Sequence, residues 1–263
     1  MTHSAHFIQL PYSFAGFVVG SLVGLTGVGG GALMTPLLVL ILGVDPAIAV
    51  GTDLLYAGIT KFSGSAVHHA RGSIDWKVVR RLASGSAPAS LLTLAALAYS
   101  GAGSSRSNHA MCAVLGYALL LTAAALLFRP WLAAKAQPLF RSLPEARTGW
   151  LTVCLGAALG IVVTLSSVGA GAIGVTALLI LYPRLPTLRI VGSDIAHAVP
   201  LTLIAGAGHW MIGSVDWPML ISLLLGSIPG ITVASHFAPR APDRLLRCLL
   251  ALALVMAGVR LAL

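Results

Sequence analysis

Charged side chains are scarce in this sequence. Only 9% of its 263 residues are Asp, Glu, Lys or Arg, whereas soluble domains contain roughly 25%. Hydrophobic residues make up 57% of the chain, and its mean hydropathy is +0.94. Because so few charges cannot cover a protein that folds in water, the shortage excludes a soluble globular domain. The composition predicts an all-α polytopic membrane protein whose surroundings are the lipid bilayer.

Cysteine and the common catalytic patterns are also rare. The three cysteines, Cys112, Cys154 and Cys248, are isolated within apolar runs, and their spacing gives neither a CxxC pair nor a Cys/His ligand set. We interpret them as packing residues. The sequence also lacks a P-loop, an HExxH motif and HxxxH or DxxxD spacing. It therefore predicts no enzyme, no metal and no cofactor.

The few charges are mostly basic, with 16 Lys and Arg residues against seven Asp and Glu and a formal net charge of +9. Nucleic-acid binding would require these cations to gather with aromatic side chains, but they are spread over short loops. The positive-inside rule explains them better, since cations mark the cytoplasmic loops of membrane proteins. The opening "MTHSAHFIQL" lacks the cationic start of a signal peptide, so we expect the first apolar region to be retained.

Apolar runs long enough to cross a bilayer, about 20 residues, recur along the chain. Two further apolar regions, 8–43 and 149–182, are too long for one span and are interrupted by glycines. We predict six simple membrane-spanning helices at residues 48–70, 82–99, 110–128, 190–212, 217–235 and 246–263.

The sequence contains an internal repeat. "TGVGGGA" at 26–32 returns at 166–172 as "SSVGAGA", and "VGTDLLYA" at 50–57 returns at 191–198 as "VGSDIAHA". "GSIDW" at 72–76 and "GSAP" at 85–88 return as "GSVDW" at 213–217 and "GSIP" at 226–229. Several polar and glycine matches in one register predict two homologous halves.

The loop charges indicate that the two halves have opposite orientations. The loop from Arg71 to Arg81 holds four cations, whereas the matching loop after His209 holds none before Trp217. Because cations mark the cytoplasmic face, equivalent loops lie on opposite sides, which predicts inverted-topology repeats. The predicted parts are a first transmembrane repeat at 1–128, a basic cytoplasmic linker at 129–147 and a second transmembrane repeat at 148–263.

Inversion requires that residues 8–43 and 149–182 each enter and leave the membrane on one side, as helical hairpins. Each repeat is then a glycine-tipped hairpin plus three transmembrane helices. An arm such as 31–43 would reach about 20 Å at about 1.5 Å per residue, less than the roughly 30 Å hydrocarbon core. We therefore expect the tips to lie deep in the membrane, and both chain termini to face the exterior.

The two hairpin tips are candidate anion-binding elements. Non-helical backbone at membrane depth survives only where protein buries it or where it lines a wet cavity. Glycines leave backbone N–H groups uncovered, and the start of the following half-helix attracts anions through its dipole. The alternative is that these glycines only permit close helix packing. The predicted substrate-binding residues are Thr26, Gly27, Val28, Gly29, Gly30, Gly31, Ser166, Ser167, Val168, Gly169, Ala170 and Gly171.

Charged residues within the predicted spans are also candidates, because an ionisable side chain inside a membrane usually faces a cavity or a partner. Asp53 and Asp194 occupy equivalent places, each after a hydroxyl residue, Thr52 or Ser193. They are interpreted either as proton carriers and site-orienting groups or as helix-terminal caps. Lys61 lies about two turns after Asp53 and is predicted to attract the anion, or else to balance the Asp53 charge.

The histidines within or beside the spans are further candidates for proton coupling, since histidine titrates near neutral pH. These residues are His68, His69, His197 and His209. Asp75 and Asp216, each followed by a tryptophan, are interpreted instead as helix starts with an aromatic anchor at the membrane interface. For His68 and His209, which precede these turns, capping at the interface is an equal alternative.

These motifs resemble the TauE/SafE sulfite exporter family, also called the TSUP family. The resemblance rests on "GVGGGALMTPLL", "AVGTDLLYAGITKFSG", the "GSIDW" turn, "GSAPAS" and their second-half counterparts. It implies a multi-pass carrier in the bacterial inner membrane for sulfite, sulfoacetate or related organosulfonates. "GTD" and "GSD" depart from the "GTS"-like form of many relatives, which leaves the substrate and the coupling ion open.

We therefore predict a secondary transporter for a small sulfur-containing anion, working by alternating access and coupled to protons in one version of the hypothesis. The alternatives are an anion channel, which needs a continuous polar pore, and a permease for another small anion such as sulfate or thiosulfate. A homodimer is left open as a further partner.

Overall fold

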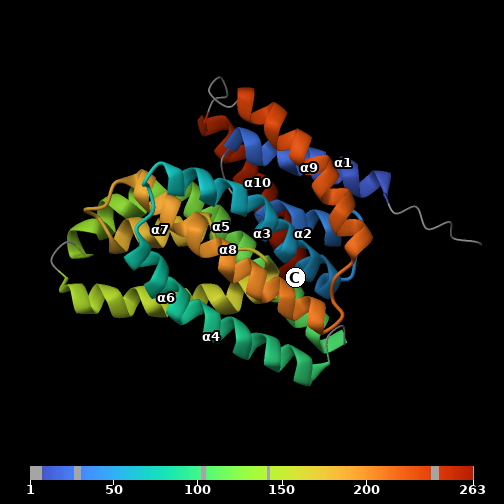
Figure 1. Ribbon diagram of the computed structural model, residues 1–263, viewed down its shortest axis with the longest axis horizontal. Coiled ribbons are helices and arrows are strands. Elements are labelled where there is room, and N and C mark those ends of the chain that lie inside the picture. The colour runs from blue at the N-terminus through green and yellow to red at the C-terminus, as the bar shows by residue number, and fades with distance from the viewer. Residues whose placement is uncertain (1–7, 27–30, 102–104, 141–142, 238–242, 263) are drawn as a thin grey trace, which may run out of the picture.

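The computed structural model describes residues 8–26, 31–101, 105–140, 143–237 and 243–262, and within them all regular structure is α-helical. This agrees with the all-α prediction. Figure 1 shows the ten helices α1 to α10 in chain order. Their bounds are α1 Leu10–Thr26, α2 Gly31–Leu40, α3 Pro46–Ala70, α4 Trp76–Ser100, α5 Ser105–Phe140, α6 Glu145–Ser166, α7 Ala172–Leu181, α8 Thr187–Met211, α9 Trp217–Phe237 and α10 Asp243–Ala262.

Five of these helices are long and apolar enough to cross a membrane, namely α4, α5, α6, α8 and α9. They include the predicted spans 82–99, 110–128, 190–212 and 217–235. Two of these predictions are one residue too long: α8 ends at Met211, and the apolar stretch of α9 ends at Ala234. The spans predicted at 48–70 and 246–263 correspond to α3 and α10. The 25 residues of α3 have a span's length, and they include Asp53, Lys61 and two histidines.

Both glycine-interrupted regions form helix pairs, α1 with α2 and α6 with α7. The second arm of each pair has 10 residues, which reach about 15 Å at about 1.5 Å per residue. The expectation that all four arms are short is wrong for α6, whose 22 residues are enough for a full span. Each pair therefore joins a longer helix to a half-length helix across the glycine-rich segment.

The predicted linker at 129–147 does not begin as a loop. Helix α5 runs without interruption from Ser105 to Phe140, a total of 36 residues, and includes Pro130 and Pro138. Such a helix is about 54 Å long at a rise of about 1.5 Å per residue, more than a bilayer core requires. Its last turns therefore continue past the predicted span, while the division of the chain into two repeats and a linker stays a prediction.

The three cysteines do not all fill the interior. Cys112 is half-buried, whereas Cys154 and Cys248 are exposed on the outer surface of the helices. Their interpretation as packing residues is therefore wrong for Cys154 and Cys248. In a bilayer such exposed apolar positions contact lipid, which tolerates a thiol as readily as an aliphatic side chain.

Helices from the two halves pack on one another in matching pairs. Helix α1 packs on α9, and its counterpart α6 packs on α4, while α3 and α8 cross between these pairs. Figure 1 shows α1 and α9 along one edge and α4 and α6 along the opposite edge. A Cβ added at Gly16 would overlap the Leu223 carbonyl, and a Cβ at Gly156 would overlap the Leu82 carbonyl. Small residues thus allow the close backbone approach that membrane helices use.

Helices α3 and α8 run antiparallel to each other. Gly51, near the start of α3, lies against His209, near the end of α8. Gly192, near the start of α8, lies against His68, near the end of α3. These helices occupy equivalent positions in the two halves of the sequence, and they pack against each other with opposite chain directions.

The aspartates predicted to start helices do so. The Asp75 side chain caps α4 by accepting hydrogen bonds from the amides of Lys77 and Val78, at 3.0 and 3.3 Å. Asp216 accepts a bond of 2.9 Å from the Met219 amide in the first turn of α9. These side chains satisfy backbone donors that a helix start leaves without intrahelical partners. The capping interpretation is confirmed for both.

Replacing Gly156 with alanine should lower the thermal stability of the protein. In an open helix position alanine would be favoured over glycine by about 1 kcal/mol, but here its methyl group meets the Leu82 carbonyl. Overpacking of this kind costs about 1–3 kcal/mol. Thermal unfolding in detergent would measure the change, and Gly64→Ala is the control because the nearest atom to its Cβ is 3.8 Å away. A Gly156→Ala protein as stable as the Gly64→Ala protein would contradict this packing.

Candidate functional site

Asp53 is fully buried in α3 and is held by the half-length helix α2. The Thr35 hydroxyl donates a hydrogen bond of 2.5 Å to Asp53 Oδ2. The second carboxylate oxygen, Oδ1, has no hydrogen-bond partner among the described residues. Ser167, from the tip of the other hairpin, is a second hydroxyl residue near this carboxylate, but it makes no hydrogen bond to it. A buried carboxylate with only one satisfied oxygen costs folding free energy, and such groups are usually retained for a functional reason.

Asp194 has the equivalent place in α8, with 1% of its surface exposed. Its Oδ1 atom also lacks a hydrogen-bond partner within the described structure. That oxygen lies directly over Gly174 in the first turn of α7, where any Cβ would overlap it. The backbone amide of Gly171 acts on the same carboxylate. Each aspartate thus lies against the half-length helix of its own half.

Lys61 interacts electrostatically with both carboxylates. It is half-buried on α3, and its ammonium group donates a hydrogen bond of 3.4 Å to the carbonyl oxygen of Ala170. Both Asp53 and Asp194 act electrostatically on Lys61. A lysine from the first half therefore reaches the glycine-rich tip of the second half, where both aspartates also lie. Of the two roles predicted for Lys61, balancing Asp53 and attracting an anion, the geometry is compatible with both.

The second hairpin tip is an irregular turn with strained backbone. Ser167 is left-handed at φ 58°, and Gly169 and Gly171 have φ values of 124° and 127°. Such values are reached at little cost only by glycine. The turn is fixed internally, because the Ser167 amide donates to the Val163 carbonyl at 2.7 Å and the Val168 amide to the Ser166 hydroxyl at 3.2 Å.

The start of α7 leaves backbone donors at this tip. The first N–H groups of any helix lack intrahelical acceptors, and the residue at the N-cap position of α7, Gly171, has no side chain to cap them. The Ser167 hydroxyl is buried and has no hydrogen-bond partner in the part of the chain that the structure describes. Uncapped amides beside a lysine are the donor set that a small oxyanion requires.

The first hairpin tip cannot be compared in the same detail. Gly27, Val28, Gly29 and Gly30 lie outside the described residues. Thr26 is the last residue of α1 and Gly31 the first of α2, so these two predicted site residues flank the tip.

Thr52 and Ser193 serve the contact between the halves rather than the centre. The Thr52 hydroxyl accepts a hydrogen bond of 3.1 Å from the Asp216 amide. The Ser193 hydroxyl accepts one of 2.8 Å from the Asp75 amide. Each residue before a buried aspartate thus binds the turn that starts a helix in the other half.

The histidines fall into two groups. His68 is half-buried at the end of α3, where its Nδ1 lies 2.8 Å from the Ser73 hydroxyl. His69 is exposed beside the Trp76 ring. His197 and His209 are fully buried in α8.

The buried histidines contact the helices of the α4–α6 pair. His197 Nε2 is 2.8 Å from the Ser86 hydroxyl of α4, and His209 Nε2 is 2.9 Å from the Thr164 carbonyl of α6. The Nδ1 atoms of both rings have no hydrogen-bond partner among the described residues. In each ring, therefore, only one of the two nitrogen atoms has a hydrogen-bond partner.

Sequence reasoning missed Thr35 and Ser86, which hold Asp53 and His197. Ser86 lies in the repeated "GSAP" motif, so the repeat already marked its position although the hydroxyl was not singled out. Thr35 lies within the quoted "GVGGGALMTPLL" motif and matches Thr176 in the second half, but its contact with Asp53 depends on how α2 packs against α3.

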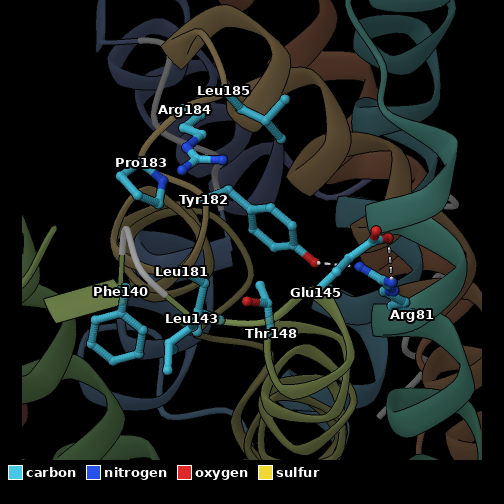
Figure 2. Close-up of a pocket in the computed structure, with 10 residues that line it drawn as sticks. All are labelled: Arg81, Phe140, Leu143, Glu145, Thr148, Leu181, Tyr182, Pro183, Arg184 and Leu185. Atoms are coloured by element: carbon cyan, nitrogen blue, oxygen red, sulfur yellow. Dashed lines mark hydrogen bonds and ion pairs between the residues drawn. The ribbon is translucent and has the colours of Figure 1, made fainter. Parts of the chain in front are cut away.

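A second polar feature lies away from this centre, at the ends of α4, α6 and α7. A pocket of about 280 Å³ opens there, and Figure 2 shows Tyr182 directed toward Arg81 and Glu145 within it. Arg81 donates to Tyr182 at 3.4 Å and to Glu145 at 3.2 Å, and Lys77 also pairs with Glu145. The lining residues are Arg81, Phe140, Leu143, Glu145, Thr148, Leu181, Tyr182, Pro183, Arg184 and Leu185. This pocket contains none of the predicted site residues.

Comparisons with known proteins give a consistent result. A family model described as "Sulfite exporter TauE/SafE" matches residues 12–261. The probable membrane transporter protein YjnA of Bacillus subtilis (strain 168) is 40% identical over 247 residues, which cover 94% of this chain and 96% of that protein. The probable membrane transporter protein YdhB of the same organism is 25% identical over 249 residues, covering 93% and 96%. A probable membrane transporter protein of Xylella fastidiosa is 26% identical over 230 residues, covering 86% and 83%. No solved structure matches the chain significantly.

Proposed function

Because the chain belongs to the TauE/SafE sulfite exporter family of membrane transporters, we propose that it is a secondary transporter for small sulfur-containing anions. Sulfite, sulfoacetate and related organosulfonates are the substrate class, and the bacterial inner membrane is the location. The observation that carries this proposal is the meeting of Lys61, Asp53 and Asp194 at the tip of the second hairpin. Ionisable side chains within the membrane-spanning part of a protein usually belong to its substrate or ion pathway.

The two halves act as inverted-topology repeats in this proposal. Its support is the antiparallel packing of α3 on α8, together with the matched contacts of Thr52 and Ser193 with the opposite half. Inverted repeats place the substrate site at their interface near the membrane midplane, formed by interrupted helices. The half-length helices α2 and α7, each lying against a buried aspartate, have the form that such a site needs.

The anion binds between Lys61 and the start of α7. Uncapped amides at a helix start supply several hydrogen bonds along the helix dipole, and the ammonium group supplies a full charge. A sulfite or sulfonate group offers three oxygens to these donors. The Ser167 hydroxyl adds a further donor from the same tip.

The charges of this centre explain why transport would be coupled to protons. With Asp53 and Asp194 ionised and Lys61 protonated, the three groups sum to one negative charge, which repels an anion. Uptake of a proton neutralises that charge and makes anion binding favourable. Proton binding and anion binding are then linked, so a proton gradient drives the anion across the membrane.

Flux measurements with purified protein in proteoliposomes test the transport proposal. Vesicles loaded with unlabelled sulfite, sulfoacetate, sulfate or thiosulfate should accelerate uptake of the labelled form of the same anion, because a carrier exchanges one bound anion for another. The rate should saturate with concentration. Protein-free vesicles at the same pH correct for passive leak.

Two outcomes would contradict this assignment. Unitary conductance without counterflow would identify an anion channel, since a channel needs no exchange step. Counterflow confined to an anion without sulfur would keep the carrier mechanism and overturn the substrate class.

A further inference from the structure

The two halves of the protein build similar polar groups around their buried aspartates, with one chemical difference. Tyr56 follows Asp53 by three residues, and His197 follows Asp194 by three residues, at equivalent positions of the repeat. Three residues are close to one helical turn, so each ring lies on the same face as its aspartate. The first half therefore has a phenol where the second half has an imidazole.

The serines beside these rings occupy equivalent positions as well. His197 Nε2 lies 2.8 Å from the Ser86 hydroxyl on α4, whereas the Tyr56 hydroxyl and its neighbour on α9, the Ser227 hydroxyl, have no hydrogen-bond partner among the described residues. Ser86 and Ser227 are the serines of the repeated "GSAP" and "GSIP" motifs. Both rings are buried, with His197 at 0% and Tyr56 at 1% exposure. Burial and the neighbouring serine match, so the two positions differ in the chemistry of the ring and in its hydrogen bonding.

Two polar atoms of the second group are left unsatisfied on one face of α8. His197 Nδ1 and Asp194 Oδ1 both lack a hydrogen-bond partner among the described residues. A protonated imidazole has two N–H donors, and Ser86 accounts for one ring nitrogen only. The second donor would have no acceptor in the observed arrangement, whereas the Asp194 oxygen one turn away is an acceptor without a donor.

We propose that His197 is the residue that carries the transported proton, and that Tyr56 fixes the equivalent position of the first half without titrating. This deepens the transport proposal above and rests on it. On protonation, the Nδ1 donor of His197 and the free oxygen of Asp194 become partners, which requires α8 to rearrange against Gly174 of α7. Proton binding is thereby joined to movement of the half-length helix that holds the anion.

The described surroundings of His197 contain few other ionisable groups. Lys61, from α3, is the charged side chain that acts on it, and Asp194 lies one turn away on its own helix. Helix α4 contributes the Ser86 hydroxyl. Its cations Lys77, Arg80 and Arg81 lie in its first two turns, where Lys77 and Arg81 pair with Glu145. Helix α7 has no ionisable side chain. The ionisable side chains of α6 are Glu145 and Arg147 in its first turn and Cys154, which is exposed.

The charge balance sets the expected stoichiometry. Protonating His197 changes the sum of Asp53, Lys61, Asp194 and His197 from one negative charge to zero. Arg129 of α5, which also acts on Asp194, adds the same positive charge in both states, so the change between the two states is still one charge. One proton therefore accompanies each anion into the centre. With the membrane potential clamped at zero, one coupled proton supports about tenfold accumulation for each unit of pH difference, since one unit corresponds to about 1.4 kcal/mol.

Replacing His197 with tyrosine, the residue of the first half, tests this assignment. The experiment compares counterflow exchange with accumulation driven by a pH gradient, in the same proteoliposomes and with the anion that gives the strongest counterflow. In His197→Tyr the accumulation ratio should fall from about tenfold to about one, and counterflow should no longer rise as the pH falls, because the group that takes up the proton is gone. Tyr56→Phe is the matched control and should keep both activities.

The outcomes separate the two proposals. Gradient-driven accumulation that survives in His197→Tyr overturns the role of His197 and leaves the transporter intact. Absence of counterflow in the unaltered protein, for every anion tried, overturns the transport proposal and this inference together. If His197→Tyr does not fold, His197→Gln replaces it, since glutamine keeps a hydrogen bond to Ser86 and cannot carry the proton.

Discussion

Replacing Lys61 with methionine is expected to weaken binding of the transported anion by about ten- to a hundredfold. A hydrogen bond to a charged group contributes about 1.5–3 kcal/mol, and each step of about 1.4 kcal/mol is a factor of ten in affinity. Methionine keeps most of the volume of the lysine chain, so packing against the Ala170 segment is retained. Isothermal titration of purified protein with the transported anion measures the change.

Lys77→Met is the matched control for this experiment. Lys77 also pairs with a carboxylate, Glu145, but lies exposed at the start of α4, so its loss should leave anion affinity unchanged. Since Lys61→Met leaves two buried aspartates without their counter-charge, Lys61→Met/Asp53→Asn serves as a second variant with a smaller charge imbalance. An affinity equal to that of the unaltered protein in either Lys61 variant would remove Lys61 from the binding site.

Replacing Gly174 with alanine should reduce transport severely while the protein still inserts into the membrane. The added methyl group would occupy the position of Asp194 Oδ1, so either the carboxylate or the first turn of α7 must move. Overpacking costs about 1–3 kcal/mol, which corresponds to about five- to more than a hundredfold in an equilibrium. The initial counterflow rate measures the loss.

Gly64→Ala provides the control for helix propensity and expression. Gly64 lies on α3, but its Cβ would have only an ordinary contact, 3.8 Å from Ile195. It should transport normally. If Gly174→Ala transports as fast as Gly64→Ala, the contact of Gly174 with Asp194 has no part in the mechanism.

The repeat made part of this arrangement predictable from the sequence. The shared register of the repeated motifs aligned Asp53 with Asp194 and identified the glycine-rich segments as hairpin tips. The equivalent surroundings of the two aspartates follow from that pattern, because matching neighbours in a duplicated fold occupy matching places, whereas the sequence left open whether they are site residues or helix caps. The caps at Asp75 and Asp216 were predictable for a local reason, since a carboxylate before a helix satisfies that helix's own amides.

Contacts between distant helices could not be predicted in this way. The bond from Thr35 to Asp53, the pairing of His197 with Ser86 and the approach of Lys61 to Ala170 all depend on which helices pack together. A periodicity of apolar residues does not define that packing when helices are hydrophobic on every side.

The glycines illustrate the same limit. Gly16 and Gly156 lie in apolar runs where glycine is unfavourable for a helix, and only the neighbouring carbonyls of Leu223 and Leu82 explain them. The alternative that glycines permit close helix packing therefore describes these two well. At the second tip, Gly169 and Gly171 are needed for a different reason, because their positive φ angles are unfavourable for residues with a side chain.

The location of the bound anion is the most direct test of the central claim, that the second hairpin tip and Lys61 form one substrate site between the halves. Electron cryomicroscopy of the protein in lipid nanodiscs, at saturating concentration of the transported anion, would provide it. The account predicts density within hydrogen-bond distance of the Lys61 ammonium group and the amides at the start of α7. Density confined to the outer pocket beside Arg81 and Arg184, with protein packed tightly around Lys61, would contradict it.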